Sequence, residues 1–374
     1  MNFRDLVKQY NVLKPDIDKA MIDTAASGGY IMGRAVKELE ASLAEYVGVK
    51  HCISCANGTD ALTLALKAWG IGAGDAVFVP DFTFFASAEV VSLEGATPVF
   101  IDIDEDTFNI DVKSLEKAIE KTLKDGKLTP KVIITVDLFG LPADYYAVKK
   151  IADKYKLLIL EDGAQGFGGK IGERMACSLG DISTTSFFPA KPLGCYGDGG
   201  AVFTNNDEWA KLMDSYRVHG KGSFKYDNVR IGMNSRLDTI QAAILQVKFE
   251  AFKNYEVEDV NKATAHYTEK LKGIVKTPVI PEGYYSSWAQ YTIQLKDREQ
   301  RDGLQAYLKE QGIPSMVYYP TPMHKQTAYK DLNYPANSNP VTQRLCSTVL
   351  SLPIHPYITE EDIEKVCEFV VSYV

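Results

Sequence analysis

Two short strands joined by a glycine-rich loop are predicted by the stretch Ser183-Thr-Thr-Ser-Phe-Phe-Pro-Ala-Lys-Pro-Leu-Gly-Cys-Tyr-Gly-Asp-Gly-Gly-Ala-Val-Phe-Thr204. The strands are expected over Ile182–Phe188 and Ala201–Thr204, and the loop carries one lysine, Lys191. Flanking aromatic and proline residues favour a fixed side chain, and glycines let the backbone approach a ligand. An amine held for Schiff-base chemistry is one interpretation. A surface lysine is the other, and this stretch alone favours it because most lysines are exposed.

Composition and charge narrow the class of protein. The chain has 374 residues, of which 45% are hydrophobic and 24% charged, which is typical of a soluble globular protein of two domains. The net charge of −8, with no basic run, argues against nucleic-acid binding. Met1–Ala20 lacks the apolar core of a signal peptide, and no apolar run reaches membrane-spanning length, so a cytoplasmic location is expected.

Cysteine and histidine spacing predicts neither a disulfide framework nor a metal site. Six cysteines in a chain of this length are too few for a disulfide scaffold. Cys52 and Cys55 form a C-x-x-C, but no second pair follows at zinc spacing, and both fall in a predicted buried strand. The five histidines show no H-x-x-x-H or H-x-x-E-H pattern.

Short apolar strands alternate with helices over the first half of the chain, which predicts a mainly parallel sheet covered on both faces. The predicted strands are His51–Cys55, Ala76–Pro80, Pro98–Ile103, Lys131–Asp137 and Leu157–Leu160. The predicted helices are Phe3–Ala26, Ala35–Val47, Asp60–Trp69, Ser87–Leu93, Val112–Leu123 and Tyr145–Tyr155. Sheets of this kind bind ligands at the carboxyl ends of their strands.

Polar or aromatic residues follow three of these strands. Asn57-Gly58-Thr59-Asp60 precedes a helix, which suits either a phosphate site or an ordinary N-cap. Glu161-Asp162 ends a buried strand, which requires a cation or a hydrogen-bond donor nearby unless the segment is a solvated loop. The aromatic residues of Phe82-Thr83-Phe84-Phe85 either belong to the hydrophobic core or include a ring that stacks on a flat cofactor.

A phosphate cradle, an acid, a stacking ring and a fixed lysine together form the components of a pyridoxal phosphate site. Neither G-x-G-x-x-G at a strand–helix turn nor G-x-x-x-x-G-K-[ST] is present, so a nicotinamide oxidoreductase is disfavoured. The order of the motifs resembles that of the DegT/DnrJ family of sugar aminotransferases. The matching segments are Tyr30–Gly33, Asn57–Leu62, Gly95–Asp104, Glu161–Gln165, Ser186–Lys191, Gly197–Ala201, Asn234–Asp238 and Leu350–Pro353.

The resemblance implies the fold and the cofactor-binding residues. It implies a fold-type I, aspartate aminotransferase-like α/β architecture, with a large seven-stranded, mainly parallel sheet domain (1–240) and a smaller C-terminal α/β domain (241–374). Lys191 matches the catalytic lysine, which binds pyridoxal 5'-phosphate covalently and moves a proton. The other matches are Asp162 for the pyridine nitrogen, Gln165 for the phenolic oxygen, Phe84 for ring stacking, and Gly58, Thr59, Ser186 and Asn234 for the phosphate.

Function and partners follow from the same resemblance. Asn234 would come from the neighbouring subunit, which implies a homodimer with shared active sites. The implied substrates are a keto nucleotide sugar and, as amino donor, glutamate, with a role in amino-sugar or surface polysaccharide biosynthesis. Gly163 stands where the family more often has alanine or cysteine, with little effect expected. The alternatives are a dehydratase of the same fold, whose histidine this chain replaces by Lys191, and a non-enzymatic regulatory protein.

The loop Tyr318–Gln326 bears on which sugar carbon is aminated. Its Tyr-Pro-x-Pro-x-His form resembles the WbpE-like branch, which aminates UDP-linked sugars at C3. Without the resemblance, the loop is a rigid turn with a solvated histidine. The substrate-binding residues expected from the match are Tyr30, Arg236, Tyr319 and His324.

The C-terminal part is predicted as one long helix or two in succession over Ser235–Lys272, followed by further strands and helices. Strands are expected over Tyr291–Leu295 and Ser315–Tyr319, around a helix at Glu299–Gln311. A loop at Tyr334–Pro340 and a closing helix at Thr359–Tyr373 complete the chain.

Overall fold

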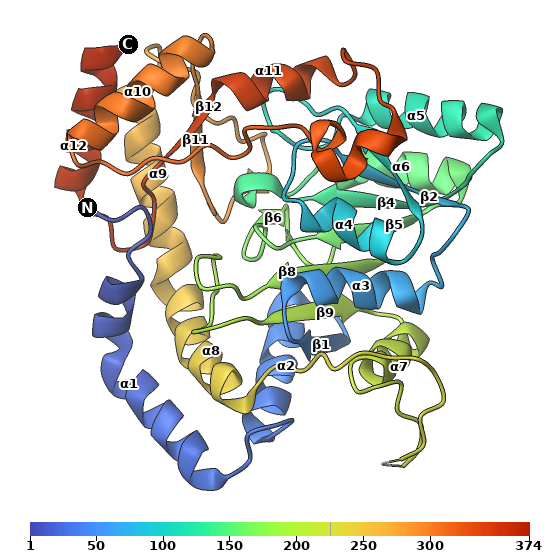
Figure 1. The fold of residues 1–374 in the computed structure, drawn as a ribbon. Coiled ribbons are helices and arrows are strands. Elements are labelled where there is room, and N and C mark those ends of the chain that lie inside the picture. Colours follow the sequence, from blue (N-terminus) through green and yellow to red (C-terminus); the bar gives the residue numbers. More distant parts are fainter. Residues whose placement is uncertain (225) are drawn as a thin grey trace.

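A seven-stranded sheet forms the centre of the computed structural model, which describes residues 1–224 and 226–374 (Figure 1). The strand order is β1 (His51–Cys55), β9 (Gly200–Thr204), β8 (Ile182–Ser186), β5 (Leu158–Asp162), β4 (Thr129–Val136), β2 (Asp75–Pro80) and β3 (Thr97–Ile101). Only β9 runs antiparallel to its neighbours; the pairs β8–β5, β5–β4, β4–β2 and β2–β3 are parallel. The predicted fold class is confirmed.

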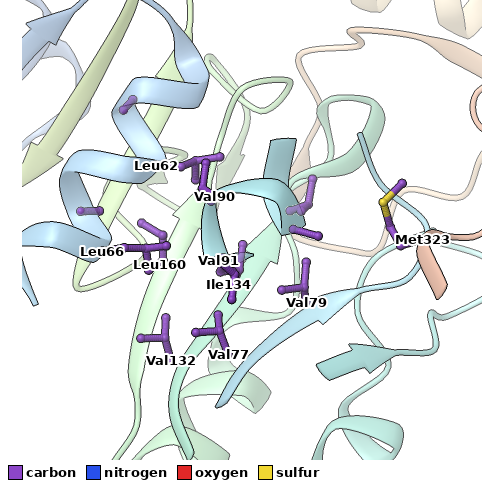
Figure 2. Packing of buried hydrophobic residues seen from close by; sticks show 14 of the residues in the cluster. Leu62, Leu66, Val77, Val79, Val90, Val91, Val132, Ile134, Leu160 and Met323 are labelled. Carbon is purple, nitrogen blue, oxygen red and sulfur yellow. The ribbon is translucent and has the colours of Figure 1, made fainter. Parts of the chain in front are cut away.

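The apolar strands alternate their side chains between the two faces of the sheet, and helices cover both faces. On one face, α3 (Gly58–Ala68) and α4 (Ala86–Leu93) pack on β2, β4 and β5. Figure 2 shows the side chains of this layer, which include Leu62, Leu66, Val77, Val79, Val90, Val91, Val132, Ile134 and Leu160. On the other face, α5 (Val112–Asp125) and α6 (Tyr145–Tyr155) cover Phe78, Ile133 and Ile159.

The N-terminal helix lies along the helices that lead out of the large sheet (Figure 1). α1 (Leu6–Ser27) and α2 (Arg34–Val47) both contact α8 (Thr239–Ala251). A π-helical turn, Phe252–Glu256, joins α8 to α9 (Val257–Leu271). The long helical segment predicted at Ser235–Lys272 is therefore two helices in succession.

The C-terminal part adds a two-stranded sheet and further helices. β11 (Tyr291–Gln294) pairs antiparallel with β12 (Val349–Leu352), and α10 (Arg298–Glu310) and α12 (Glu360–Tyr373) pack beside them. A second small sheet is made of β6 (Lys170–Ile171), β7 (Arg174–Met175) and β10 (Tyr284–Tyr285). Met323, Tyr329 and Leu345 pack into the same core cluster as β2 and β4. The division of the chain at residue 240 stays a prediction.

Some elements differ from the sequence-based expectation. The strand expected at Ser315–Tyr319 is wrong: only Met316 bridges to Ser351, because the chain then turns toward the large sheet, where the Met323 N–H donates to the Asp81 carbonyl. Among the described residues, the α-helices α7 (Asp207–Tyr216) and α11 (Pro340–Thr348) were not predicted. Within residues 1–224 and 226–374, no helix combines the length and apolar character needed to cross a bilayer.

Candidate active site

Residues from four strand ends meet at the carboxyl edge of the large sheet. β5 ends in Asp162 and β8 in Ser186, while Asp81 follows β2 and Asn57 follows β1 by two positions. Open α/β sheets bind their ligands at this edge. The site is therefore described from these four ends and from the Lys191 loop that follows β8.

A narrow corner between β8 and the start of α3 provides a cradle for an anion. Asn57 caps α3, its side-chain oxygen accepting from the Asp60 N–H at 2.8 Å. A Cβ on Gly58 would lie only 2.7 Å from the Cβ of Ser186, so only glycine fits. The first N–H groups of a helix lack partners within the helix and favour negative charge. Thr59 and Ser186 add hydroxyls, and the set fits a phosphate group.

Asp162 is buried and held by two hydrogen bonds. Its Oδ2 accepts from the Ser87 hydroxyl at 2.7 Å and its Oδ1 from the Ala164 N–H at 3.2 Å. Burial raises the pKa of the Asp162 carboxyl, while these hydrogen bonds and the charge of Lys191 oppose that rise. Hydrogen bonds accepted by a buried carboxylate favour its ionised form, which can pair with the protonated ring nitrogen of a cofactor. Ser87 was not predicted from the sequence, because it lies 75 positions from Asp162 and no local pattern links them.

Both polar atoms of the Gln165 side-chain amide form hydrogen bonds. Its Oε1 accepts from the Phe139 N–H at 2.8 Å, and its Nε2 donates to the Tyr319 hydroxyl at 3.1 Å. Burial raises the pKa of the Tyr319 phenol, so this hydroxyl stays protonated. The structure thus brings together one residue expected at the cofactor and one expected at the substrate.

Lys191 sits in a loop whose backbone is closed by its own hydrogen bonds. The Lys191 N–H donates to the Phe188 carbonyl at 2.9 Å, and the Cys195 N–H donates to the Phe187 carbonyl at 2.8 Å. Burial lowers the pKa of the Lys191 amine, the negative charge of Asp162 opposes this, and the positive charge of Arg4 adds to it. A lowered pKa increases the uncharged fraction of the amine at a given pH, and the uncharged amine is the nucleophile.

The remaining expected residues are Phe84, Tyr30, Asn234 and Arg236. Phe84 is 57% exposed and Tyr30 is 56% exposed. Asn234 and Arg236 flank Ser235, which is fully buried and whose hydroxyl accepts from the Ala56 N–H beside the cradle. In the described part of the chain, no hydrogen bond or ion pair joins Tyr30, Asn234 or Arg236 to Lys191 or Asp162.

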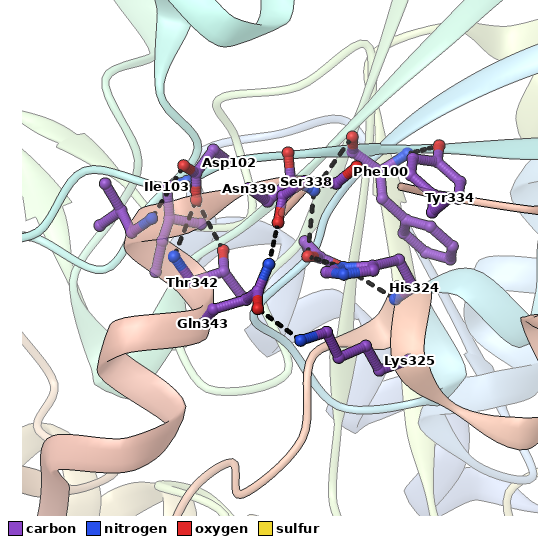
Figure 3. Close-up of polar contacts among 12 residues, drawn as sticks. Phe100, Asp102, Ile103, His324, Lys325, Tyr334, Ser338, Asn339, Thr342 and Gln343 are labelled. Carbon is purple, nitrogen blue, oxygen red and sulfur yellow. Dashed lines mark hydrogen bonds and ion pairs between the residues drawn. The ribbon is translucent and has the colours of Figure 1, made fainter. Parts of the chain in front are cut away.

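His324 is buried in a polar network rather than presented on an open turn (Figure 3). Its Nδ1 lies 2.5 Å from Asp81 Oδ2, and its backbone N–H donates to Asp81 Oδ1 at 2.8 Å. The Asn339 amide also donates to Asp81, and the Tyr334 ring packs 5.7 Å away. The Nε2 of His324 is buried without a protein partner. Contact between His324 and a sugar stays a prediction.

The space around Gly163 is too small for an added side chain unless its neighbours shift. A Cβ added there would meet the Cys177 Sγ at 2.7 Å and the Thr184 carbonyl oxygen at 2.9 Å. Contacts this short require the neighbours to move. An alanine at this position would therefore require its neighbours to shift, while the expectation that glycine here has little effect on function stays a prediction.

A protein-family model, described as the DegT/DnrJ/EryC1/StrS aminotransferase family, matches residues 11–371. The chain is 44% identical to "UDP-2-acetamido-2-deoxy-3-oxo-D-glucuronate aminotransferase" of Pseudomonas aeruginosa, over 98% of each chain. It is also 44% identical to a "Pleiotropic regulatory protein" of Geobacillus stearothermophilus, over 98% of this chain and 97% of the relative.

Solved structures agree along the whole chain. A DegT DnrJ EryC1 StrS aminotransferase from Brucella abortus has a TM-score of 0.96 and 50% identity, covering 100% of this chain and 99% of that one. A putative sugar aminotransferase from Streptococcus pneumoniae, solved in its PLP form, has a TM-score of 0.89 and 26% identity over 96% of each chain. Since the family model and the full-length relatives cover both the sheet and the Lys191 loop, the chain belongs to the DegT/DnrJ/EryC1/StrS aminotransferase family.

Proposed function

We propose that this sugar aminotransferase transfers an amino group from glutamate to C3 of a UDP-linked 3-keto sugar. The observation that carries the proposal is the 44% identity, over nearly the full length, to a relative named for a UDP-linked 3-oxo sugar acid. A second relative, named as a UDP-N-acetyl-3-dehydro-glucosamine 3-aminotransferase from Acidithiobacillus ferrooxidans, is 39% identical over 97% of this chain. The Tyr319-Pro-x-Pro-x-His324 pattern is consistent with the same carbon.

Pyridoxal phosphate is the cofactor of this enzyme, as the sequence predicts. The cofactor supplies an aldehyde carbon and an electron-accepting ring. The cradle formed by Gly58, Thr59 and Ser186 fits its phosphate, because a side chain on Gly58 would fill that corner. Asp162, with its carboxylate held by Ser87, would keep the ring nitrogen protonated. Phe84 would lie against the ring and Gln165 beside the phenolic oxygen.

Lys191 performs the proton movement in this proposal. Its Nζ takes the proton from the α-carbon of the donor and later delivers a proton to C3 of the sugar. The lowering of this amine's pKa by burial makes its uncharged form more available to accept a proton. Tyr319, held by Gln165, would offer its protonated hydroxyl to the substrate as a hydrogen-bond donor.

A homodimer with shared sites is part of the proposal. Asn234 is exposed and Arg236 is partly exposed, while Ser235 between them is buried. Exposed and partly exposed groups beside the cradle are consistent with a contribution across a subunit boundary. A cytoplasmic location is proposed from the sequence alone.

The dimer is tested by complementation. Lys191→Ala and an Asn234→Ala/Arg236→Ala double variant, each inactive alone, are mixed under subunit-exchange conditions. Heterodimers should regain activity, because one of their two sites then has both its own lysine and intact partner residues. Exchange demonstrated with tagged subunits, without recovery of activity, would remove the shared-site proposal.

The sugar assignment is tested by a half-reaction. The enzyme is first converted by glutamate to the amino form of the cofactor, and UDP-linked 3-keto and 4-keto sugars are then offered separately. Return of the original absorbance with the 3-keto sugar alone, together with an amino sugar in the product, supports the proposal. Return with the 4-keto sugar alone contradicts it. A deoxygenated product would indicate a dehydratase, and no response to glutamate or to any sugar would favour a regulatory role.

A further inference from the structure

Two cationic side chains donate hydrogen bonds to backbone carbonyls of the loop that carries Lys191. The Arg4 Nη2 donates to the carbonyl of Lys191 itself at 3.0 Å. The Nζ of Lys248, a side chain only 2% exposed, donates to the carbonyl of Gly194 in the same loop. The first contact fixes the lysine's own main chain, and it comes from a residue 187 positions away.

The segment around Arg4 is anchored independently of the loop. The Ile354 N–H donates to the Phe3 carbonyl at 3.2 Å, and the Lys8 Nζ donates to the Tyr357 carbonyl at 2.8 Å. The Phe3 ring packs edge-on against Tyr318, with centroids 6.3 Å apart. Arg4 therefore has a fixed place between the C-terminal loop and the Lys191 loop.

Charged groups around Arg4 form a small buried cluster. Glu256, 1% exposed, accepts on its Oε1 from the Gln9 amide at 2.8 Å and from the Tyr357 hydroxyl at 2.6 Å. Within the described residues, Arg4 forms no ion pair, and it lines a small cavity together with Lys191 and His355. Its positive charge is consequently only partly compensated.

We propose that Arg4 is a positioning residue for Lys191, which fixes the lysine's main chain through the Lys191 carbonyl and places a positive charge at the cavity that both residues line. The family model begins at residue 11, so Arg4 lies outside the part of the chain that the model matches. The proposal rests on Lys191 as the reactive amine, but the protonation of that amine can be measured whatever the sugar substrate is.

The electrostatic surroundings agree with this geometry. Burial lowers the pKa of Lys191, Asp162 raises it, and Arg4 lowers it. The other groups facing Arg4 do not replace its effect on Lys191. The negative charge of Glu256 opposes the lowering of the pKa of Arg4 and of Lys248 by burial. Burial lowers the pKa of His355 to about 4, so this ring is uncharged at neutral pH.

The test is the pH dependence of acetylation at Lys191 in the full-length, cofactor-free protein. A trace of acetic anhydride labels only uncharged amines, and mass spectrometry measures the rate at each lysine. Arg4→Gln should slow labelling of Lys191 near neutral pH by about three- to tenfold. Removing a neighbouring positive charge raises the pKa of an amine by up to about one unit, which reduces its uncharged fraction. Arg4→Lys keeps a cation and should retain most of the wild-type rate.

Lys8→Gln is the matched control, since it also removes an N-terminal cation and a hydrogen bond to a C-terminal carbonyl. Its labelling profile at Lys191 should equal that of the wild type. An unchanged profile in Arg4→Gln would overturn the proposal, and so would equal slowing in Arg4→Lys and Arg4→Gln. Thermal midpoints identify any variant that fails to fold; if Arg4→Gln fails, Arg4→Met is measured in its place under the same criteria.

Discussion

The side-chain amide of Gln165 donates a hydrogen bond to the hydroxyl of Tyr319 across 3.1 Å, joining residues 154 positions apart. The sequence assigned Gln165 to the cofactor and Tyr319 to the substrate, as separate expectations. The contact couples the two, because a change in one side chain removes a hydrogen-bond partner of the other.

Tyr319→Phe should therefore reduce turnover while leaving the fold intact. Loss of this hydrogen bond should lower the free energy of unfolding by about 1 kcal/mol. It should also let the Gln165 amide reorient, which denaturant unfolding and steady-state kinetics would reveal. Tyr318→Phe is the control, because in the described part of the chain the Tyr318 hydroxyl makes no hydrogen bond. Equal effects of the two substitutions would contradict the importance of this contact.

Lys191→Ala should abolish both activity and the covalent link to the cofactor, since Lys191 is the lysine within the sequence of this loop, residues 187–199. Lys191→Arg should be equally inactive, because a guanidinium stays protonated and cannot attack a carbonyl. The measurement is borohydride reduction followed by peptide mapping. A reducible link at the active site in either variant would show that Lys191 is not the reacting amine.

Ser87→Ala removes a donor that stabilises the charged form of Asp162. The pKa of Asp162 should rise further, so protonation of this carboxyl begins at a higher pH than in the wild type. Because only the ionised carboxylate pairs with a protonated ring nitrogen, loss of cofactor affinity on acidification should move to higher pH. Spectroscopic titration of cofactor binding measures this shift. Thr83→Val, which alters only the neighbour of Ser87, should move it less.

The fold was largely predictable, because the signals for its elements are local. The structure reproduces the predicted bounds of β1 (His51–Cys55) and α6 (Tyr145–Tyr155), where apolar spacing alone is informative. α11 was missed because its first turn is capped from another part of the chain: the Val341 and Thr342 N–H groups donate to Asp102. Such a cap leaves no trace in the local sequence.

Some residues of the candidate site could also be predicted from local sequence, whereas others could not. Lys191 and Asp162 stand in recognisable motifs, so the sequence could single them out. Ser87 and Arg4 act through contacts made only when distant segments pack together. His324 was singled out by the prolines around it, but its direction depends on Asp81, which no loop pattern reveals.

Gly163→Ala should destabilise the protein by about 1–3 kcal/mol, because the new methyl group meets the Cys177 Sγ and the Thr184 carbonyl. Adding Cys177→Ala should recover only part of the loss, since it removes the sulfur contact but not the backbone contact. Thermal or denaturant unfolding of both single variants and the double variant measures the coupling. Full additivity of the two changes would mean that the sulfur and the methyl do not compete for this space.

His324→Ala distinguishes a structural role from contact with the sugar. The substitution leaves Asp81 buried with fewer hydrogen-bond partners, so the free energy of unfolding should fall by about 1–3 kcal/mol. If His324 acts only through Asp81, the folded variant should keep both half-reactions, with glutamate and with the sugar. If the unpartnered Nε2 meets the sugar, the sugar half-reaction alone should slow. Asn339→Ala is the matched control, because it also removes a donor to Asp81 and leaves His324 in place. A sugar-specific defect in His324→Ala, absent from Asn339→Ala, would therefore assign the histidine to the substrate.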